Sequence, residues 1–319
     1  MKKVLLTILV LLIIIAILGG VVAFIYIDKI NKINYVDTSN EEIEMSEGIE
    51  EKLSGYRNIV LFGLDSSQFK GRSDCIIIFS LNQETNDVKM TSIYRDTYVQ
   101  VPGHGYTKTN HAYAYGGASL AMSTINKNLD LDIKEFVTVN FAIVKDVVDY
   151  VGGVEINVTQ TDLSDPIRKI PGITKPGTYN LNGHQALEYG RIRFVDSDYK
   201  RTERMRTVIN AVFNKVKKMS LTEMNTFVDK ILPQVQTNIK MSEITKMLTK
   251  VPSFNIKESI GWPYEVQGKT IGGVWYGVPR TLKSCVTKLH QELFDEEDYQ
   301  TTETVNDISA TIVKKTGVK

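Results

Sequence analysis

The segment 189–206, YGRIRFVDSDYKRTERMR, contains five arginines and one lysine against three acidic residues, although the whole chain has a formal net charge of only +1. Positive charges gathered this densely repel one another unless anions neutralise them. The planar guanidinium group binds phosphate oxygens through two parallel hydrogen bonds. The segment therefore predicts a binding site for an anionic, phosphate-bearing ligand.

The secondary structure expected for this segment turns several arginines toward one place. If YGRIRF is a strand, the side chains of Arg191 and Arg193 point to the same face. In the helix expected next, Arg201 lies one turn before an apolar stripe and therefore points inward. Asp198 alone cannot neutralise four arginines, and buried guanidinium groups need anions. The four are Arg191, Arg193, Arg201 and Arg204, and the stripe is Met205, Val208, Ile209, Val212, Phe213 and Val216.

Three apolar runs upstream bring a second set of charges together. The runs 58–64, 75–81 and 88–94 are bounded by turn residues and predict strands. If the second strand is antiparallel to both others, one edge of the sheet collects Asp65, Asp74 and Arg95, with Arg72 nearby. Two carboxylates at that edge could hold Mg²⁺, with Mn²⁺ as the alternative ion, against phosphate oxygens. Scattered surface ion pairs are the simpler interpretation of these residues.

Strands and helices alternate through the rest of the chain. We expect a helix over 118–129, strands at FVTVNF and VEINV, and a helix at AIVKDVVDYVGG between them. Further on, two helical patterns, MSEITKMLTKV and RTLKSCVTKLHQELF, flank strands and turns at 260–279. This intermixing predicts the α/β class, an α-β-α layered domain with a mixed sheet.

The N-terminus predicts a membrane anchor. Residues 4–27 carry no charge and are long enough to cross a bilayer, whereas a cleavable signal peptide has a shorter apolar core. Lys2 and Lys3 precede the span, so we expect a cytoplasmic N-terminus and an extracytoplasmic domain. The expected organisation is a stub at 1–3, a transmembrane helix at 4–27, an acidic stalk at 28–56, a domain at 57–294 and a polar, partly mobile tail at 295–319.

Several function classes are disfavoured by what the sequence lacks. The only cysteines, Cys75 and Cys285, are too far apart for a small disulfide scaffold, and whether they pair is open. There is no HExxH zinc pattern, no GxxxxGK[ST] phosphate loop and no GxSxG nucleophile turn. The near-neutral charge does not favour a nucleic-acid partner.

The motifs of residues 57–219 resemble the LytR-CpsA-Psr family of membrane-anchored bacterial cell-wall enzymes. The resemblance rests on NIVLFGLDSS, GRSD, SIYRDT, KTNHAYAYGG, VNF, VGGVEINV, LNGHQALEYGRIR and SDYKRTERMR, in this order. It implies one N-terminal span and an extracytoplasmic α-β-α domain. It also implies transfer of a glycopolymer from a polyprenyl-pyrophosphate carrier onto peptidoglycan, through a phosphodiester link.

The resemblance also implies roles for individual residues. It makes Asp65 and Asp74 the Mg²⁺ ligands and Asp198 an acid that orients an arginine or assists deprotonation. Where the family usually has a glutamine this chain has Met205, and GLDSS lacks the family's usual arginine. Asn110 could be structural or functional, whereas His104 and His111 are expected to be loop residues. The expected pyrophosphate clamp is Arg72, Arg95, Lys108, Arg191, Arg193, Arg201 and Arg204, and Arg95 is counted among the catalytic groups.

The expected protein is therefore a Mg²⁺-dependent phosphotransferase in the cell membrane of a Gram-positive type bacterium. Its expected partners are a polyprenyl-pyrophosphate-linked glycan donor, a peptidoglycan acceptor and the bilayer. The glycopolymer itself, whether teichoic acid, capsule or another wall polymer, stays open. Two alternatives remain: a hydrolase of the same donor that uses water as acceptor, and a regulatory or binding protein of the envelope.

Overall fold

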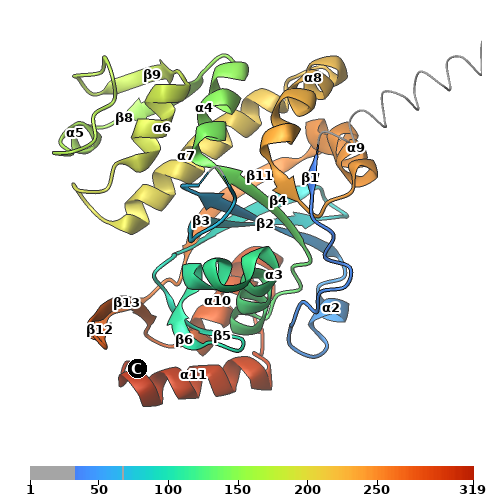
Figure 1. The fold of residues 1–319 in the computed structure, drawn as a ribbon, viewed down its shortest axis with the longest axis vertical. Helices are drawn as coiled ribbons and strands as arrows, with labels where there is room; N and C mark the ends of the chain where they lie inside the picture. Colours follow the sequence, from blue (N-terminus) through green and yellow to red (C-terminus); the bar gives the residue numbers. More distant parts are fainter. Residues whose placement is uncertain (1–32, 67) are drawn as a thin grey trace, which may run out of the picture.

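The computed structural model describes residues 33–66 and 68–319. A twisted central sheet lies between two layers of helices, which confirms the expected α-β-α domain (Figure 1). The expected stub and transmembrane helix at 1–27 lie outside the described residues. Within the described residues, no helix combines the length and the apolar composition needed to span a bilayer.

The central sheet has seven strands in the order β1-β10-β7-β2-β3-β4-β11. The three strands expected first form its middle, and β3 is antiparallel to both β2 and β4 as predicted. β7 and β11 join them in parallel with β2 and β4 respectively, so the sheet is mixed. The strands are β1 (Asn34–Tyr35), β2 (Tyr56–Leu64), β3 (Ser73–Asn82), β4 (Asp87–Ile93), β7 (Glu135–Asn140), β10 (Gln236–Thr237) and β11 (Asn255–Trp262).

One face of the sheet is covered by α3 (Thr109–Leu129) and α10 (Leu282–Phe294), with α11 (Glu303–Thr316) packed outside them (Figure 1). Alternate side chains of β3, Ile76 and Ile78, enter this larger core. α3 begins nine residues earlier than expected, because a short helical segment precedes the predicted helix and joins it across a kink at Gly116 and Gly117. Gly117 has φ +64°, a conformation that favours glycine.

The opposite face carries the helices that lie between β7 and β11 in the chain (Figure 1). Cys75 and Ile77 of β3 point to this side and pack near Ile209. Two of the helices approach closely at Gly183, where a Cβ atom would clash with the backbone carbonyl oxygen of Lys145. The helices are α4 (Phe141–Tyr150), α5 (Gln160–Leu163), α6 (Gly183–Arg191), α7 (Asp198–Val216), α8 (Leu221–Ile231) and α9 (Met241–Lys250).

Three hairpins and some short elements complete the described fold. The hairpins are β5 (Tyr98–Val101) with β6 (Gly105–Lys108), β8 (Val154–Val158) with β9 (Gly177–Leu181), and β12 (Val266–Ile271) with β13 (Val274–Pro279). The short helices are α2 (Ile49–Lys52), η1 (Leu232–Gln234) and η2 (Val251–Ser253).

Two predicted boundaries are wrong. The supposed stalk contributes β1 to the sheet, and Ile49 and Leu53 are buried in the larger core. The supposed mobile tail contains α11, whose buried residues include Val305, Ile308 and Ile312. In both segments the polar composition concealed a few apolar residues spaced to reach the core. The two cysteines are buried and are not joined by a disulfide bond.

A polar network fixes α11 and the last turn of α10 to the core. Asp130 accepts hydrogen bonds from the hydroxyl groups of Tyr299, at 3.0 Å, and Thr302, at 2.6 Å. His290 stacks on Tyr299 and hydrogen-bonds the carbonyl oxygen of Leu129 at 3.0 Å. The imidazole is fully buried, and this burial lowers the pKa of His290 to about 4. The neutral imidazole, donating to a carbonyl, is therefore part of the folded structure.

We expect His290 to make the fold sensitive to mild acid. The unfolded chain binds a proton near pH 6.5, but folded His290 does so only near pH 4, so the free energy of unfolding should fall between these values. A shift of this size corresponds to at most about 3 kcal/mol. Urea unfolding at pH 7 and pH 4.5 should show a smaller loss for His290→Gln than for the parent. The exposed His184→Gln is the matched control, and an equal loss in all three proteins would contradict the assignment.

Candidate anion-binding site

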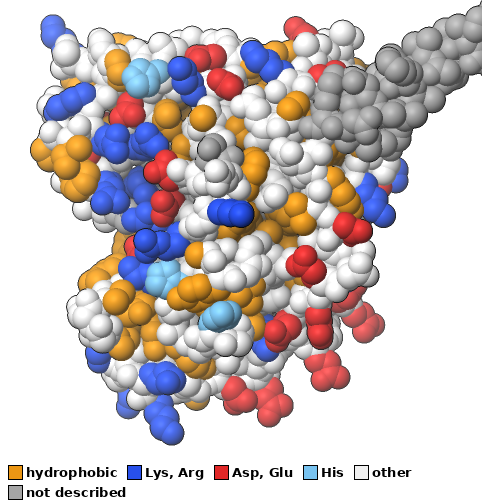
Figure 2. Space-filling view, in the orientation of Figure 1, with side chains coloured by type: hydrophobic (Ala, Val, Ile, Leu, Met, Phe, Trp, Pro, Cys, Tyr) orange, Lys and Arg blue, Asp and Glu red, His pale blue; other side chains and the backbone are white. Residues whose placement is uncertain are grey.

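The predicted edge of the sheet exists and forms one side of a cleft. Asp65 follows β2, Asp74 lies at the start of β3 and Arg95 follows β4, and all three line the cleft as expected. The cleft has a volume of about 290 Å³. Figure 2 shows Lys and Arg side chains gathered along an indentation on the left of this face. The remaining lining residues are Phe141, Ile167, Arg168, Gly190, Arg191, Arg193, Phe194, Arg201 and Met205.

Five arginines and two aspartates thus share the cleft. Arg95 pairs with the Asp74 carboxylate at 2.6 Å, and Arg191 pairs with Asp65 at 3.2 Å. Arg201, buried on the inward side of α7 as predicted, donates to the backbone carbonyl oxygen of Asp74 at 3.1 Å. The two carboxylates are outnumbered by the guanidinium groups, so the cleft favours an anionic ligand.

Asp96 is a member of this network that sequence reasoning did not single out. Its carboxylate lies 2.6 Å from the ammonium group of Lys108 and 3.4 Å from Nε of Arg95. The residue directly follows Arg95 in the motif SIYRDT, which was the available signal. By contacting both cations, Asp96 fixes the position of Arg95 at the end of β4.

Arg191 and Arg193 line the cleft, but their backbone conformation differs from the predicted strand. The expected strand YGRIRF is in fact the last turn of α6 followed by an irregular segment. The helix begins at a capping box in which the side chains of Asn182 and Gln185 bond each other's backbone N–H groups. Ile192, fully buried, turns the chain out of the helix, and both flanking arginines line the cleft.

The buried carboxylate of Asp165 joins the two loops that carry Arg168 and Arg193. Asp165 accepts the backbone N–H groups of Ile167 and Arg168 at one oxygen and those of Arg193 and Phe194 at the other, at 2.8 to 3.0 Å. Burial by itself would raise the pKa of Asp165, but the four hydrogen bonds outweigh it and lower the pKa to about 2. Arg168, which sequence reasoning missed, is brought beside Arg193 in this way.

Arg204 does not line the cleft, contrary to the prediction. Its guanidinium group is buried and bonds Asp162 at 2.7 Å, Asp196 at 2.5 Å and the carbonyl oxygen of Ile192 at 3.1 Å. On α7, Arg204 follows Arg201 by three residues and faces the segments before and after α6. Its anionic partners are therefore side chains of the protein itself.

The other predicted residues lie around the cleft. Arg72 and Lys108 do not line it, and Arg72 is exposed. The pKa of His111 is lowered mainly by the burial of its imidazole and further by the positive charges of Arg72 and Lys108. His111 belongs to α3 and is not a loop residue, whereas His104 lies in the β5–β6 turn. Asn110 donates its backbone N–H to the carbonyl oxygen of Arg95 at 3.1 Å. Asp198 is the first residue of α7, and its side chain lies outside the described part.

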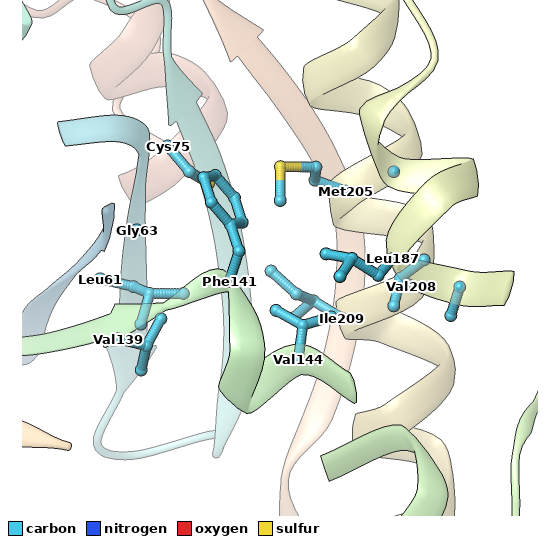
Figure 3. Close-up of a pocket in the computed structure, with 12 residues that line it drawn as sticks. Leu61, Gly63, Cys75, Val139, Phe141, Val144, Leu187, Met205, Val208 and Ile209 are labelled. Atoms are coloured by element: carbon cyan, nitrogen blue, oxygen red, sulfur yellow. The ribbon is translucent and has the colours of Figure 1, made fainter. Parts of the chain in front are cut away.

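An apolar cavity adjoins the charged cleft between the sheet and the helices α4, α6 and α7. The two spaces share Phe141, Gly190 and Met205. Figure 3 shows side chains of the sheet and of the helices converging on this space, which is almost free of polar atoms. Met205, at the position where the resemblance implies a glutamine, thus lies at the junction of the two spaces. The other lining residues are Leu61, Gly63, Cys75, Val139, Val144, Ala186, Leu187, Val208 and Ile209.

The two carboxylates of the cleft fit a Mg²⁺ ion that keeps part of its water shell. Among the described residues, no group of three or more His, Cys, Asp or Glu side chains could enclose a metal. Mg²⁺ is commonly held by one or two carboxylates together with substrate phosphates. Asp65 and Asp74 line the same cleft, and the Asp65 side chain is 70% exposed. The donor set therefore suits an ion that arrives with a phosphate ligand.

Comparisons with known proteins find a matching family model, named relatives and similar solved structures. The model of the LytR_cpsA_psr family matches residues 23–292. The chain is 34% identical over 297 residues to the polyisoprenyl-teichoic acid–peptidoglycan teichoic acid transferase TagU of Bacillus cereus, with 90% of this chain and 96% of that protein covered. The structure of protein gbs0355 from Streptococcus agalactiae has a TM-score of 0.68 at 28% identity, covering 82% and 93%. The structure of TagT bound to LI-WTA has a TM-score of 0.59 at 26% identity, covering 83% and 92%.

We expect Arg204 to stabilise the fold. Arg204→Ala removes the partner of two carboxylates, one of them almost fully buried, and breaking such a pair costs about 3–5 kcal/mol. Thermal unfolding should therefore show a large drop in melting temperature. The control is Arg168→Ala, whose more exposed side chain contacts Glu188 only at 3.4 Å and should change stability by about 1 kcal/mol or less. Equal melting temperatures for the Arg204 variant and the parent would contradict a structural role.

Proposed function

The chain belongs to the LytR_cpsA_psr family, and we propose that it transfers a glycopolymer from a polyprenyl-pyrophosphate carrier onto peptidoglycan. The proposal includes formation of a phosphodiester link and Mg²⁺ as the cofactor. A relative that is 34% identical is named as a teichoic acid transferase that uses a polyisoprenyl-linked donor and peptidoglycan. Teichoic acid is therefore the first glycopolymer to test, although the cleft itself selects only for the pyrophosphate.

The observation that carries the proposal is the direct junction of the cationic cleft with the apolar cavity. A polyprenyl pyrophosphate has a diphosphate head group on a long hydrocarbon chain. The cleft supplies five guanidinium groups for the phosphates, and the adjoining cavity offers apolar side chains for the prenyl chain. Phe141, Gly190 and Met205 lie where head and chain would meet.

The arginines would lower the barrier by stabilising negative charge. When the pyrophosphate bond breaks, charge develops on the bridging oxygen and on the leaving phosphate, and preorganised cations there reduce the activation free energy. Arg95 and Arg201 are half-buried or buried and held at the sheet edge, so they need little reorganisation. Bound Mg²⁺, held by Asp65 and Asp74, would add positive charge beside the phosphates.

The proposed location is the outer face of the cell membrane. It depends on the uncharged run at 4–27, which predicts a single span with the N-terminus in the cytoplasm. The cleft-bearing domain would then face the wall, where both the lipid-linked donor and peptidoglycan are accessible.

A transfer assay tests the proposed function. Incubation with a lipid-linked glycan and peptidoglycan should give wall-linked phosphodiester and free polyprenyl phosphate, in a Mg²⁺-dependent manner. Asp65→Ala and Asp74→Ala should each lower the rate at limiting Mg²⁺ by about 100-fold or more, because a single carboxylate holds this ion poorly. Asp37→Ala, at an exposed turn outside the cleft, is the matched control.

Omitting peptidoglycan separates the transferase from its alternatives. Release of free glycan phosphate at an undiminished rate without acceptor would favour the hydrolase. Absence of any product in both conditions, with the donor still bound, would favour a binding or regulatory protein and would overturn the transferase.

We expect the cleft arginines to contribute to ligand binding more than to folding. Arg191→Ala or Arg193→Ala should remove a charge-assisted hydrogen bond worth roughly 1.5–3 kcal/mol and weaken polyprenyl-pyrophosphate binding about tenfold or more. Without ligand, the melting temperature should stay unchanged or rise slightly, since fewer like charges share the cleft. Added ligand should raise the melting temperature of the parent more than that of the variants. A large loss in the ligand-free state, with the ligand-induced rise retained, would show that these arginines stabilise the fold instead.

A further inference from the structure

A third cavity, rich in aromatic side chains, lies beside the end of β4. Its volume is about 250 Å³. Three of its lining residues are the aromatic side chains of Tyr94, Tyr199 and Trp275, which come from the end of β4, from α7 and from the β12–β13 hairpin on the left of Figure 1. The other lining residues are Asp96, Thr97, Ser197 and Gly277. None of these residues belongs to the charged cleft or to the apolar cavity.

The aromatic groups are held in place by the fold. The rings of Tyr94 and Tyr199 lie 4.2 Å apart, centre to centre. Trp275 lies against the strand backbone at Gly268, where a Cβ atom would come within 2.9 Å of the indole nitrogen. Its side chain is nevertheless 49% exposed. The hairpin is attached to the β4 end because Gly277 donates its backbone N–H to the carbonyl oxygen of Asp96 at 3.0 Å.

At two points of the chain, residues that line the aromatic cavity lie beside residues that line the cationic cleft. Arg95 lines the cleft, whereas its neighbours Tyr94 and Asp96 line the aromatic cavity. On α7, Tyr199 lines the aromatic cavity and Arg201, two residues later, lines the cleft. The apolar cavity shares residues with the cleft but none with the aromatic cavity. The cleft therefore shares lining residues with the apolar cavity, whereas residues next to cleft residues in the chain line the aromatic cavity.

We propose that the aromatic cavity binds a sugar ring of a glycan that reacts at the phosphate held in the cleft. This inference rests on the proposed function. A sugar ring has C–H faces that pack on aromatic side chains, and hydroxyl groups at its rim that need polar partners. The cavity offers both, as specific small-molecule sites do: three aromatic rings, the carboxylate of Asp96 and the hydroxyl group of Ser197. Lys108 and Arg95 each contact the Asp96 carboxylate and so keep it in place.

The bound sugar ring could belong to the donor or to the acceptor. In the donor, the first sugar is attached to the pyrophosphate, so binding the phosphate in the cleft would carry that sugar to the cavity mouth. In the acceptor, a peptidoglycan sugar must present its hydroxyl group to the same phosphate. The experiment is therefore arranged in two arms that distinguish these sources.

The test uses the full-length chain in lipid nanodiscs and the variants Trp275→Ala, Trp275→Phe and Val274→Ala. Val274 is the matched control, since it is a similarly exposed neighbour in β13 that does not line the cavity. The donor arm compares the dissociation constant of polyprenyl pyrophosphate carrying a disaccharide with that of bare polyprenyl pyrophosphate. The acceptor arm measures KM for soluble, uncrosslinked peptidoglycan strands in the transfer reaction.

In one of the two arms, Trp275→Ala should weaken the sugar-dependent constant about tenfold, and Trp275→Phe should weaken it less because an aromatic face remains. Binding of bare polyprenyl pyrophosphate should be unchanged in every variant, which also shows that the variants fold. The chain has only two tryptophans, and Trp262 is fully buried, so sugar binding should change the fluorescence through Trp275. This signal should be absent in Trp275→Phe.

Unchanged constants for Trp275→Ala in both arms, or unchanged parent fluorescence at saturating sugar, would overturn the aromatic site. Failure of the parent to bind bare polyprenyl pyrophosphate is a different result, because it would overturn the proposed function and not merely this subsite.

Discussion

The buried carboxylate of Asp165 is the contact on which the charged cleft depends. It accepts four backbone N–H groups, two from the loop that carries Arg168 and two from the segment that carries Arg193. These loops would otherwise be pushed apart by the positive charges they bring together. A carboxylate with four donors loses its proton readily, which is why the pKa of Asp165 falls to about 2 despite burial. Its negative charge is therefore present at any physiological pH and keeps the segments of Arg168 and Arg193 next to each other.

A second buried contact, made by Arg204, stabilises the same region. It gives Arg204 a different role from Arg201, although both arginines lie on the inward side of α7. Arg201 and Arg204 are both buried on α7, and each is a guanidinium group near the apolar stripe that needs an anion. Arg204 joins Asp162 and Asp196, which lie before and after α6 in the chain, so its requirement is met within the protein. Arg201 instead lines the cleft and donates to a backbone carbonyl oxygen of β3. The arginine-rich segment therefore contains both cleft groups and a structural group.

Much of the site could be predicted because strand order follows from simple patterns. Three apolar runs joined by polar turns give antiparallel neighbours, and that alone brings Asp65, Asp74 and Arg95 to one edge. The errors came where local spacing is ambiguous. Arg191 lies two residues before the next arginine, which suits a strand, but the upstream capping box at Asn182 makes the segment helical. An arginine at position 168 was missed because it lies in an irregular loop, which only the contact through Asp165 brings to the cleft.

In the cleft, each aspartate is paired with an arginine, Asp74 with Arg95 and Asp65 with Arg191. A pyrophosphate that bound to the arginines alone would leave the carboxylates without partners and close to added negative charge, which opposes binding. If Mg²⁺ binds together with the pyrophosphate, as proposed, Asp65 and Asp74 would hold the metal and the arginines would bind phosphate oxygens. The carboxylates would then keep a positively charged partner. The proposed metal would thus account for the presence of two aspartates in a cleft that favours an anionic ligand.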